Sequence, residues 1–315
     1  MSDLPPINDP IGEALHFLRI SGAFYARCEV SAPWAVDLPA MDDFLMFHIV
    51  TQGECRVLVA DAPPLILRPG SFALVPHGAG HLMSSGEGVA PAKLFDLPRD
   101  FSADRYEIIR HGGGGAPTTI ICGAVRLEHP AAQQLLPLLP KVIHVGAWTS
   151  PEMDWIESTL RFIAAEAREL RAGGETIITR LADILVIQAI RTWIARDPGA
   201  RTGWLGALRD RQIGQAIAAI HRDPRPDWTV ATLAAGVGMS RSAFAARFTE
   251  LVGEPVMHYV ARWRMQTAVM WLREEGASVG AVAGRLGYES DAAFSRTFKR
   301  VMGSSPGAVR RNTAR

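Results

Sequence analysis

The sequence predicts an α+β protein in three successive parts: a small β-barrel or sandwich, a helical hairpin, and an all-α region with two helix-turn-helix motifs. Three observations support this prediction. Short β-rich runs fill the first 130 residues, helical periodicity follows, and a degenerate repeat occupies the last third of the chain. We place the boundaries at residues 1–130, 131–203 and 204–315, which suits a chain of 315 residues.

The first part is predicted to be β structure because short apolar, β-rich runs alternate with Gly- and Pro-bearing turns. The runs are 47–50, 56–59, 65–67, 72–75 and 118–122. Regular short strands with this punctuation are typical of a sandwich or small barrel. The four-Gly run at 112–115 precedes neither a Lys-Ser/Thr pair nor a helix. It therefore predicts a turn between strands rather than a phosphate loop.

The middle part is predicted to be a helical hairpin. Residues 153–170 and 176–195 carry apolar side chains three and four positions apart, and residues 171–174 interrupt them. The apolar faces need partners, and two are open: a second copy of the chain, which would give a homodimer, or the barrel of the same chain. Residues 197–203 indicate an interdomain linker.

A repeat in the last third of the chain predicts two helix-turn-helix motifs. The repeated positions are Ala234, Gly238, Ser240, Phe244 and Phe248 in the first copy and Ala283, Gly287, Ser290, Phe294 and Phe298 in the second. Each copy reads as a short apolar helix, a turn built around Gly, a Ser N-cap and an amphipathic helix. Two such motifs could place two recognition helices in successive major grooves, so the chain is predicted to bind double-stranded DNA.

Charge is segregated onto the same part of the chain. Residues 207–315 hold 16 Lys and Arg against 9 Asp and Glu, a net charge of +7, whereas residues 1–206 carry a net charge of −6. A basic domain that also carries helix-turn-helix motifs is what phosphate contact requires.

The second helix of each motif is expected to enter the groove. In both helices the Phe side chains face inward, which leaves an outer face for DNA. The outer residues are Arg241, Ser242, Ala245, Ala246 and Arg247 in the helix at 241–251, and Asp291, Ala292, Ser295, Arg296 and Lys299 in the helix at 291–302. Between the motifs, Pro255 opens a long helix to about Arg273, which could hold the two reading helices about one DNA turn, ~34 Å, apart.

These residues resemble the AraC/XylS family of bacterial transcription regulators. The matching stretches are 233–241, 248–255, 264–272, 283–290, 293–300 and 303–306. The resemblance implies that Ser242, Ala245, Ala246, Asp291, Ala292 and Arg296 face the bases. Ser242 and the two alanines are smaller than the polar groups common there, so the first helix is expected to contact thymine methyls, or to read through Arg241 and Arg247.

Arg296 is expected to contact a base edge, most simply as a bidentate donor to guanine. For Arg247 and Lys299 a phosphate contact is the favoured alternative to base reading.

The segment from Gly70 through Pro76 and Gly78 to His81 resembles the second conserved motif of cupin barrels. The first motif is reduced to His48, and Glu54 lies too close to follow the full pattern. The resemblance implies a cupin-like effector domain over residues 20–130. Zinc or another divalent metal at His48, His77 and His81 is one interpretation, since imidazole suits such ions. The alternative is that these histidines have structural roles.

The three cysteines show no metal-type spacing and suit a reducing cytoplasm. Cys28 follows Arg27, which can lower a thiol pKa, so a redox role for Cys28 and Cys122 is one hypothesis. Burial as small apolar side chains is the other, and it is favoured for Cys55 and Cys122.

These patterns predict a cytoplasmic, sequence-specific transcription regulator without catalytic residues. A small-molecule, metal or oxidant signal would act on the barrel, and RNA polymerase would be a partner if the protein is an activator. No membrane span or secretory signal is expected. The alternative is a metal-dependent cupin enzyme with a nucleic-acid-binding appendage, which the depleted first motif disfavours.

Overall fold

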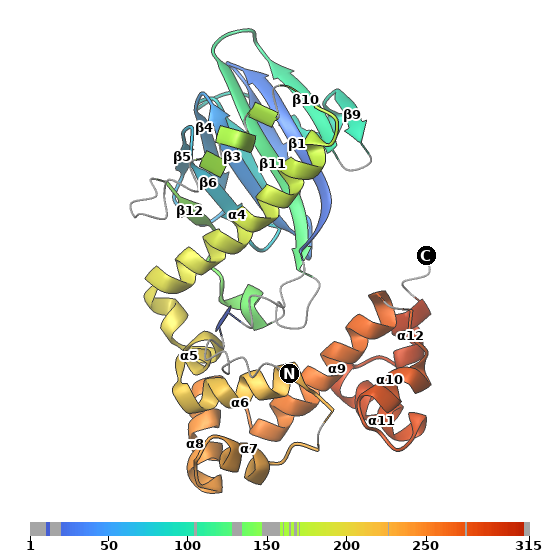
Figure 1. The fold of residues 1–315 in the computed structure, drawn as a ribbon. Coiled ribbons are helices and arrows are strands. Elements are labelled where there is room, and N and C mark those ends of the chain that lie inside the picture. The colour runs from blue at the N-terminus through green and yellow to red at the C-terminus, as the bar shows by residue number, and fades with distance from the viewer. Residues whose placement is uncertain are drawn as a thin grey trace. The chain divides into compact units, whose positions relative to one another are not determined.

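The computed structural model (Figure 1) shows a β-rich unit that ends at Arg196 and a helical unit that continues from Asp197. It describes residues 11–12, 20–103, 106–127, 134–146, 158–159, 161–163, 165–166, 169, 171–225, 227–274 and 276–311. Among these residues, none belongs to a helix long and apolar enough to cross a membrane.

The β-rich unit consists of two sheets that share one apolar core. The seven-stranded sheet has the order β12-β6-β3-β11-β1-β10-β9, and the five-stranded sheet has the order β5-β4-β7-β2-β8. The larger sheet contains β1 (Ile20–Ser31), β3 (Leu45–Gln52), β6 (Phe72–Val75), β9 (Arg99–Ala103), β10 (Tyr106–Gly112), β11 (Pro117–Leu127) and β12 (Ile143–Val145). The smaller contains β2 (Ala35–Leu38), β4 (Cys55–Val59), β5 (Leu65–Leu67), β7 (His81–Ser84) and β8 (Ala92–Lys93). Short 3-10 turns, η1 (Leu94–Asp96) and η2 (Leu136–Leu138), complete the unit.

The larger sheet is buried on both faces, which explains why five of the first six residues of β3 are apolar, with His48 as the exception. One face meets the smaller sheet, and the other is covered by α4 (Gly174–Arg196), which contacts β1, β6 and β12. Under α4, the rings of Phe47 and Phe72 stack with centroids 6.0 Å apart. The Tyr25 hydroxyl donates to Asp183 of α4 at 2.8 Å. The second helix of the expected hairpin therefore packs on the barrel of its own chain.

The expected boundary at residue 130 falls inside this unit rather than at its end. Strand β12 pairs with β6 in register from Ile143↔Leu74 to Val145↔Phe72, so the larger sheet continues into the segment assigned to the hairpin. A strand of three residues is too short to show a helical or strand period in the sequence. Most of the first hairpin helix, predicted at 153–170, lies outside the described residues.

The five predicted strands are confirmed as β3 to β6 and β11. The Gly run forms the turn between β10 and β11, as expected. Glycine is needed there because a Cβ on Gly112 would lie 1.9 Å from the Ser31 carbonyl oxygen, where φ is also +130°.

The helical unit begins with η3 (Pro198–Arg201), where the Asp197 side chain accepts from the Gly199 amide. Its helices are α5 (Gly203–Arg209), α6 (Arg211–Arg222), α7 (Val230–Gly236), α8 (Arg241–Val252), α9 (Val256–Glu274), α10 (Val279–Arg285), α11 (Asp291–Met302) and α12 (Pro306–Arg311). The long helix α9 serves two cores. Tyr259 and Trp263 lie in the first, and Met265, Ala268 and Leu272 lie in the second with α10, α11 and α12.

The structure confirms the predicted repeat, because the two turns make equivalent hydrogen bonds. In the first turn the Met239 amide donates to the Ala234 carbonyl at 2.9 Å, and in the second the Tyr288 amide donates to the Ala283 carbonyl at 2.9 Å. The central Gly238 and Gly287 have φ of +67° and +75°, a region that favours glycine. The helix pairs α7–α8 and α10–α11 are therefore two copies of one helix-turn-helix.

Candidate DNA interface and barrel cavity

The two predicted recognition helices begin at a serine cap and are anchored by two buried phenylalanines each. Ser240 accepts from the Ala243 amide at 3.3 Å, and Ser290 accepts from the Ala293 amide at 3.2 Å. These caps satisfy amides that the first helical turn leaves without partners. The anchors are Phe244, Phe248, Phe294 and Phe298, all fully buried.

The opposite faces of α8 and α11 carry the residues predicted to contact DNA. The structure exposes Arg241, Ser242, Ala246, Arg247, Asp291, Ala292, Arg296 and Lys299, and it leaves Ala245 and Ser295 half-buried. All ten therefore lie on or beside an accessible helix face. The side chain of Arg296 has no ion pair within the described residues, so it is available for a ligand.

Among the basic residues predicted to contact DNA, Arg247 differs because its side chain bonds to the residue that caps helix α6. Its Nε and Nη2 atoms donate to one carboxylate oxygen of Asp210 at 2.9 and 2.7 Å. Asp210 also caps α6, accepting from the amides of Gln212 and Ile213. Burial alone would raise the pKa of Asp210, but the two amides and Arg247 together lower it. Arg247 thus fixes α8 to α6, a contact that the sequence pattern did not indicate.

In the β-rich unit the space between the two sheets contains an almost wholly apolar cavity. It holds about 540 Å³ of empty space, the part open to solvent included. Apolar side chains of both sheets line it, with Cys28, His48 and Cys122 as exceptions, and with Trp34 in the wall. The indole Nε1–H of Trp34 is buried and has no hydrogen-bond acceptor among the described residues. Trp34 was not singled out from the sequence.

A chain of polar groups crosses one side of this cavity. His81 Nδ1 lies 2.9 Å from the Ala79 carbonyl oxygen, which can only accept, so Nδ1 carries the proton. In neutral His81 the Nε2 atom then accepts from His48 Nε2–H at 2.7 Å. His48 Nδ1 in turn accepts from the Cys122 thiol at 3.1 Å. Cys28 Sγ lies 3.9 Å from Cys122 Sγ and completes the chain.

Burial favours the uncharged forms of His48, His81 and Cys122. It lowers the pKa of His48, with a further contribution from His81, and it lowers the pKa of His81. The contact with Cys28 and burial raise the pKa of Cys122 well above its ordinary value, and burial raises that of Cys55 to about 12. Cys122 and Cys55 are therefore thiols at neutral pH, and the half-buried Cys28 is the most accessible of the three.

The three histidines predicted as metal ligands do not form one site. His77 is exposed and its Nε2 lies 2.9 Å from the Leu139 carbonyl oxygen, away from the other two. Two imidazoles on one tetrahedral zinc place their nitrogens about 3.3 Å apart, since each Zn–N bond is ~2.0–2.1 Å. The 2.7 Å between His48 and His81 is a hydrogen bond instead. Within the described residues, no group of three His, Cys, Asp or Glu could hold a metal ion.

Comparison with known proteins places both units in families. Residues 9–195 match the family described as Cupin, and residues 233–312 match the family described as Helix-turn-helix domain. An AraC-like transcription regulator of Streptomyces antibioticus is 33% identical over 96% of this chain and 99% of its own length. The regulator AlkR of Acinetobacter baylyi is 30% identical, over 95% of this chain and 97% of its own.

This chain belongs to the AraC-like transcription regulators. It combines the cupin domain and the AraC-type helix-turn-helix domain of that family, and it is a DNA-binding transcription regulator rather than an enzyme. A more distant relative, the RCS-specific transcriptional activator RclR of Escherichia coli, is 24% identical over 96% of this chain and 97% of its own length.

Proposed function

We propose that this AraC-like regulator reads a two-element operator with α8 and α11. The single observation that carries the proposal is the duplicated motif, in which two capped helices present accessible faces from one basic domain. Helix α9 has 19 residues and joins the motifs. At 1.5 Å per residue it is about 28 Å long, close to the ~34 Å of one DNA turn.

Selection of genomic fragments by the purified full-length protein tests this proposal. Enriched fragments should contain two elements about one DNA turn apart, and affinity should fall steeply with salt because Lys and Arg displace counterions. A single undivided element, or no enrichment beyond that of bulk DNA, would overturn the two-element reading.

The signal that acts on the barrel is, in our proposal, a two-electron oxidant such as a peroxide. The distance of 3.9 Å between Cys28 Sγ and Cys122 Sγ supports it, together with the histidine chain behind Cys122. Peroxide would convert the more accessible Cys28 thiol to a sulfenic acid and release one water. The Cys122 sulfur would then attack the Cys28 sulfur while His48 Nδ1 takes the thiol proton; the S–O bond breaks, and the departing hydroxide receives that proton and leaves as a second water.

Forming this disulfide would move the backbone. Cys28 pairs with Ile120 and Cys122 pairs with Ala26, so the two cysteines are diagonal neighbours on β1 and β11. Diagonal Cα atoms lie about 7–8 Å apart, whereas disulfides need ~4.4–6.8 Å. Strand β1 must therefore shift against β11, and Tyr25 on β1 carries the hydrogen bond to α4. An oxidant would thereby favour a second arrangement of the barrel and its helix.

Titration of the reduced protein with peroxide tests the oxidant response. We expect an intramolecular Cys28–Cys122 disulfide by mass spectrometry and a change in DNA affinity, both lost in Cys28→Ser and Cys122→Ser. Cys55→Ser is the matched control, because Cys55 is buried with a pKa of about 12 and should leave both unchanged. A full response in Cys122→Ser would overturn the disulfide.

A small molecule in the same cavity is a second candidate signal, favoured by the Trp34 indole, for which the described residues provide no acceptor. Such a ligand would be apolar with one acceptor oxygen. A medium-chain methyl ketone should then raise the unfolding temperature more than the alkane of equal length does, and Trp34→Phe should remove that difference. Equal effects of the two compounds on the natural protein would contradict this candidate.

We propose activation through RNA polymerase as the output, because the relative RclR is named an activator.

A homodimer would use outward side chains of α4, including the exposed Ile177 and Ile184. Sedimentation of Ile177→Lys and Ile184→Lys variants tests the dimer.

A divalent metal at His48, His77 and His81 stays a prediction that the geometry does not favour. Metal analysis of protein purified without chelator tests it.

A further inference from the structure

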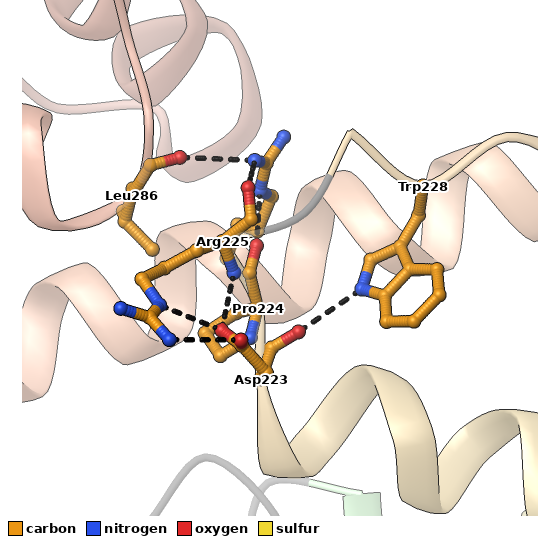
Figure 2. Close-up of polar contacts among 6 residues, drawn as sticks. Asp223, Pro224, Arg225, Trp228 and Leu286 are labelled. Atoms are coloured by element: carbon orange, nitrogen blue, oxygen red, sulfur yellow. Dashed lines mark hydrogen bonds and ion pairs between the residues drawn. The ribbon is translucent and has the colours of Figure 1, made fainter.

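One arginine of α9 connects the two helix-turn-helix motifs through main-chain carbonyl groups. Arg264 Nε donates to the Pro224 carbonyl at 2.7 Å. Its Nη2 donates to the carbonyls of Arg225 and Leu286, each at 2.9 Å. Figure 2 labels Pro224 and Arg225, in the loop before the first motif, and Leu286, at the turn of the second, whose carbonyl groups accept these hydrogen bonds.

The two sides of this junction belong to different halves of the domain. Pro224 and Arg225 lie between α6 and α7, immediately before the first motif. Leu286 ends α10 and starts the turn that leads to the recognition helix α11. The guanidinium also lies 5.6 Å from the centroid of Tyr288, whose ring packs edge-on against Phe294 of α11. Arg264 therefore contacts both the loop before the first motif and the turn of the second motif.

The described residues of the loop that provides two of the carbonyls make side-chain hydrogen bonds of their own. Arg225 Nε and Nη2 donate to the two carboxylate oxygens of Asp223 at 2.9 and 3.0 Å, and Trp228 Nε1 donates to the Asp223 carbonyl at 3.0 Å (Figure 2). The loop also approaches the second turn directly. A Cβ added to Gly287 would lie 3.2 Å from the Arg225 carbonyl oxygen. Arg264 therefore lies where the carbonyl groups of this loop approach the turn of the second motif.

We propose that Arg264 is a positioning residue that sets the distance and relative rotation of the two reading helices, and thereby the operator spacing that the protein accepts. Each motif has its own core against α9, so its fold does not depend on this junction. Between the cores, the planar guanidinium holds three carbonyls in a fixed fork that a flexible ammonium does not reproduce. The inference rests on the two-element operator proposed above.

The test compares wild-type protein with Arg264→Met and Arg264→Lys on a series of operators. The series has the natural spacer, spacers one and two base pairs shorter or longer, and each element alone. Arg262→Met is the matched control, because Arg262 is a half-buried arginine of α9 whose carboxylate partner Glu254 lies in the first half. Circular dichroism and thermal unfolding accompany every variant.

Wild-type protein and Arg262→Met should prefer the natural spacer sharply. Both Arg264 variants should bind each single element as wild type does, but their preference for the natural spacer should fall about tenfold, equivalent to ~1.4 kcal/mol. An unchanged spacer profile in both Arg264 variants would overturn the proposal. So would a parallel loss of single-element binding in both, since Arg264 would then support the heads themselves. A wild-type protein without any spacer preference would instead overturn the two-element operator.

Discussion

The two helix-turn-helix copies have the same backbone and different reading faces. Both turns close through the same amide-to-carbonyl bond, both recognition helices start at a serine, and both end at a left-handed glycine, Gly253 and Gly303. The Ser-cap and Phe-anchor positions recur 50 residues apart in sequence. The comparison shows that the turn, the caps and the buried phenylalanines determine the backbone of each motif. The outward-facing residues can differ between the copies without changing that backbone.

The outer faces differ in size, charge and attachment. With the same 50-residue offset, Ala246 of α8 corresponds to Arg296 of α11, and Arg241 corresponds to Asp291. An aspartate in the first turn of α11 is favourable to the helix dipole, whereas Arg241 at that place can meet a phosphate. On the faces predicted to meet the bases, the first helix therefore presents small side chains and the second presents a guanidinium.

The largest expected effect removes an anchor that the copies share. Phe248→Ala and Phe298→Ala should each lower the free energy of unfolding by about 3–5 kcal/mol, because both rings are fully buried and leave a cavity. Since α9 belongs to both cores, we expect one cooperative transition in denaturant for each variant. Separate transitions for the two halves would show that the copies are independent folding units.

The next largest expected effect is on DNA binding and differs between corresponding positions of α8 and α11. Arg296→Ala should cost ~1–3 kcal/mol of binding at one operator position and relax the base preference there. Ala246→Ser, at the corresponding position of α8, should change binding much less because it removes no donor. Binding measured on operators with each base substituted in turn gives both values. Equal weakening of Arg296→Ala on all sequences would make Arg296 a phosphate contact.

A smaller effect tests the shared caps. Ser240→Ala and Ser290→Ala should each cost about 1 kcal/mol of stability, since each leaves one helix amide without its side-chain acceptor. Thermal unfolding of the two single variants measures it. The comparison predicts similar losses, and a large difference would mean that one helix start is held by other contacts.

Sequence reasoning recovered the parts of the molecule that are encoded locally. Gly238, Ser240 and Phe248 and their repeats report turn, cap and anchor within one short segment, so both motifs and the long α9 were predictable. In the barrel, strands rich in apolar residues such as β3 could be predicted. Strand β1 was missed because it contains no continuous run of large apolar residues, although Arg27 and Glu29 alternate with the cavity-lining Ala26 and Cys28 at the period of a strand.

The pairings between distant segments were beyond the sequence. Cys28 and Cys122 lie 94 positions apart and meet only because β1 pairs with β11. His77, four residues from His81, was a plausible third ligand by spacing, yet it faces Leu139 instead. Arg264 stood in the family pattern without a role, since its three carbonyl partners depend on a loop and a turn brought together by folding.

The smallest expected effect concerns the ion pair between Arg247 and Asp210, in which the two copies differ. Arg247 is tied to Asp210, whereas its counterpart on α11 is Thr297. The Arg247 side chain is 48% exposed, so solvent screens the pair, and a double-mutant cycle of Arg247→Ala with Asp210→Asn should give only ~0.2–1 kcal/mol of coupling. Asparagine is used because it still caps α6.

The pH dependence of that coupling identifies its origin. The folded-state pKa of Asp210 is lowered, so the coupling should be complete above the ordinary aspartate value and vanish as the pH falls through the lowered pKa. If Arg247 instead leaves Asp210 to contact phosphate, Arg247→Ala should weaken binding equally on all sequences and reduce the salt slope by about one. Unchanged DNA affinity with measurable coupling would establish that this arginine orients the first reading helix rather than touching DNA.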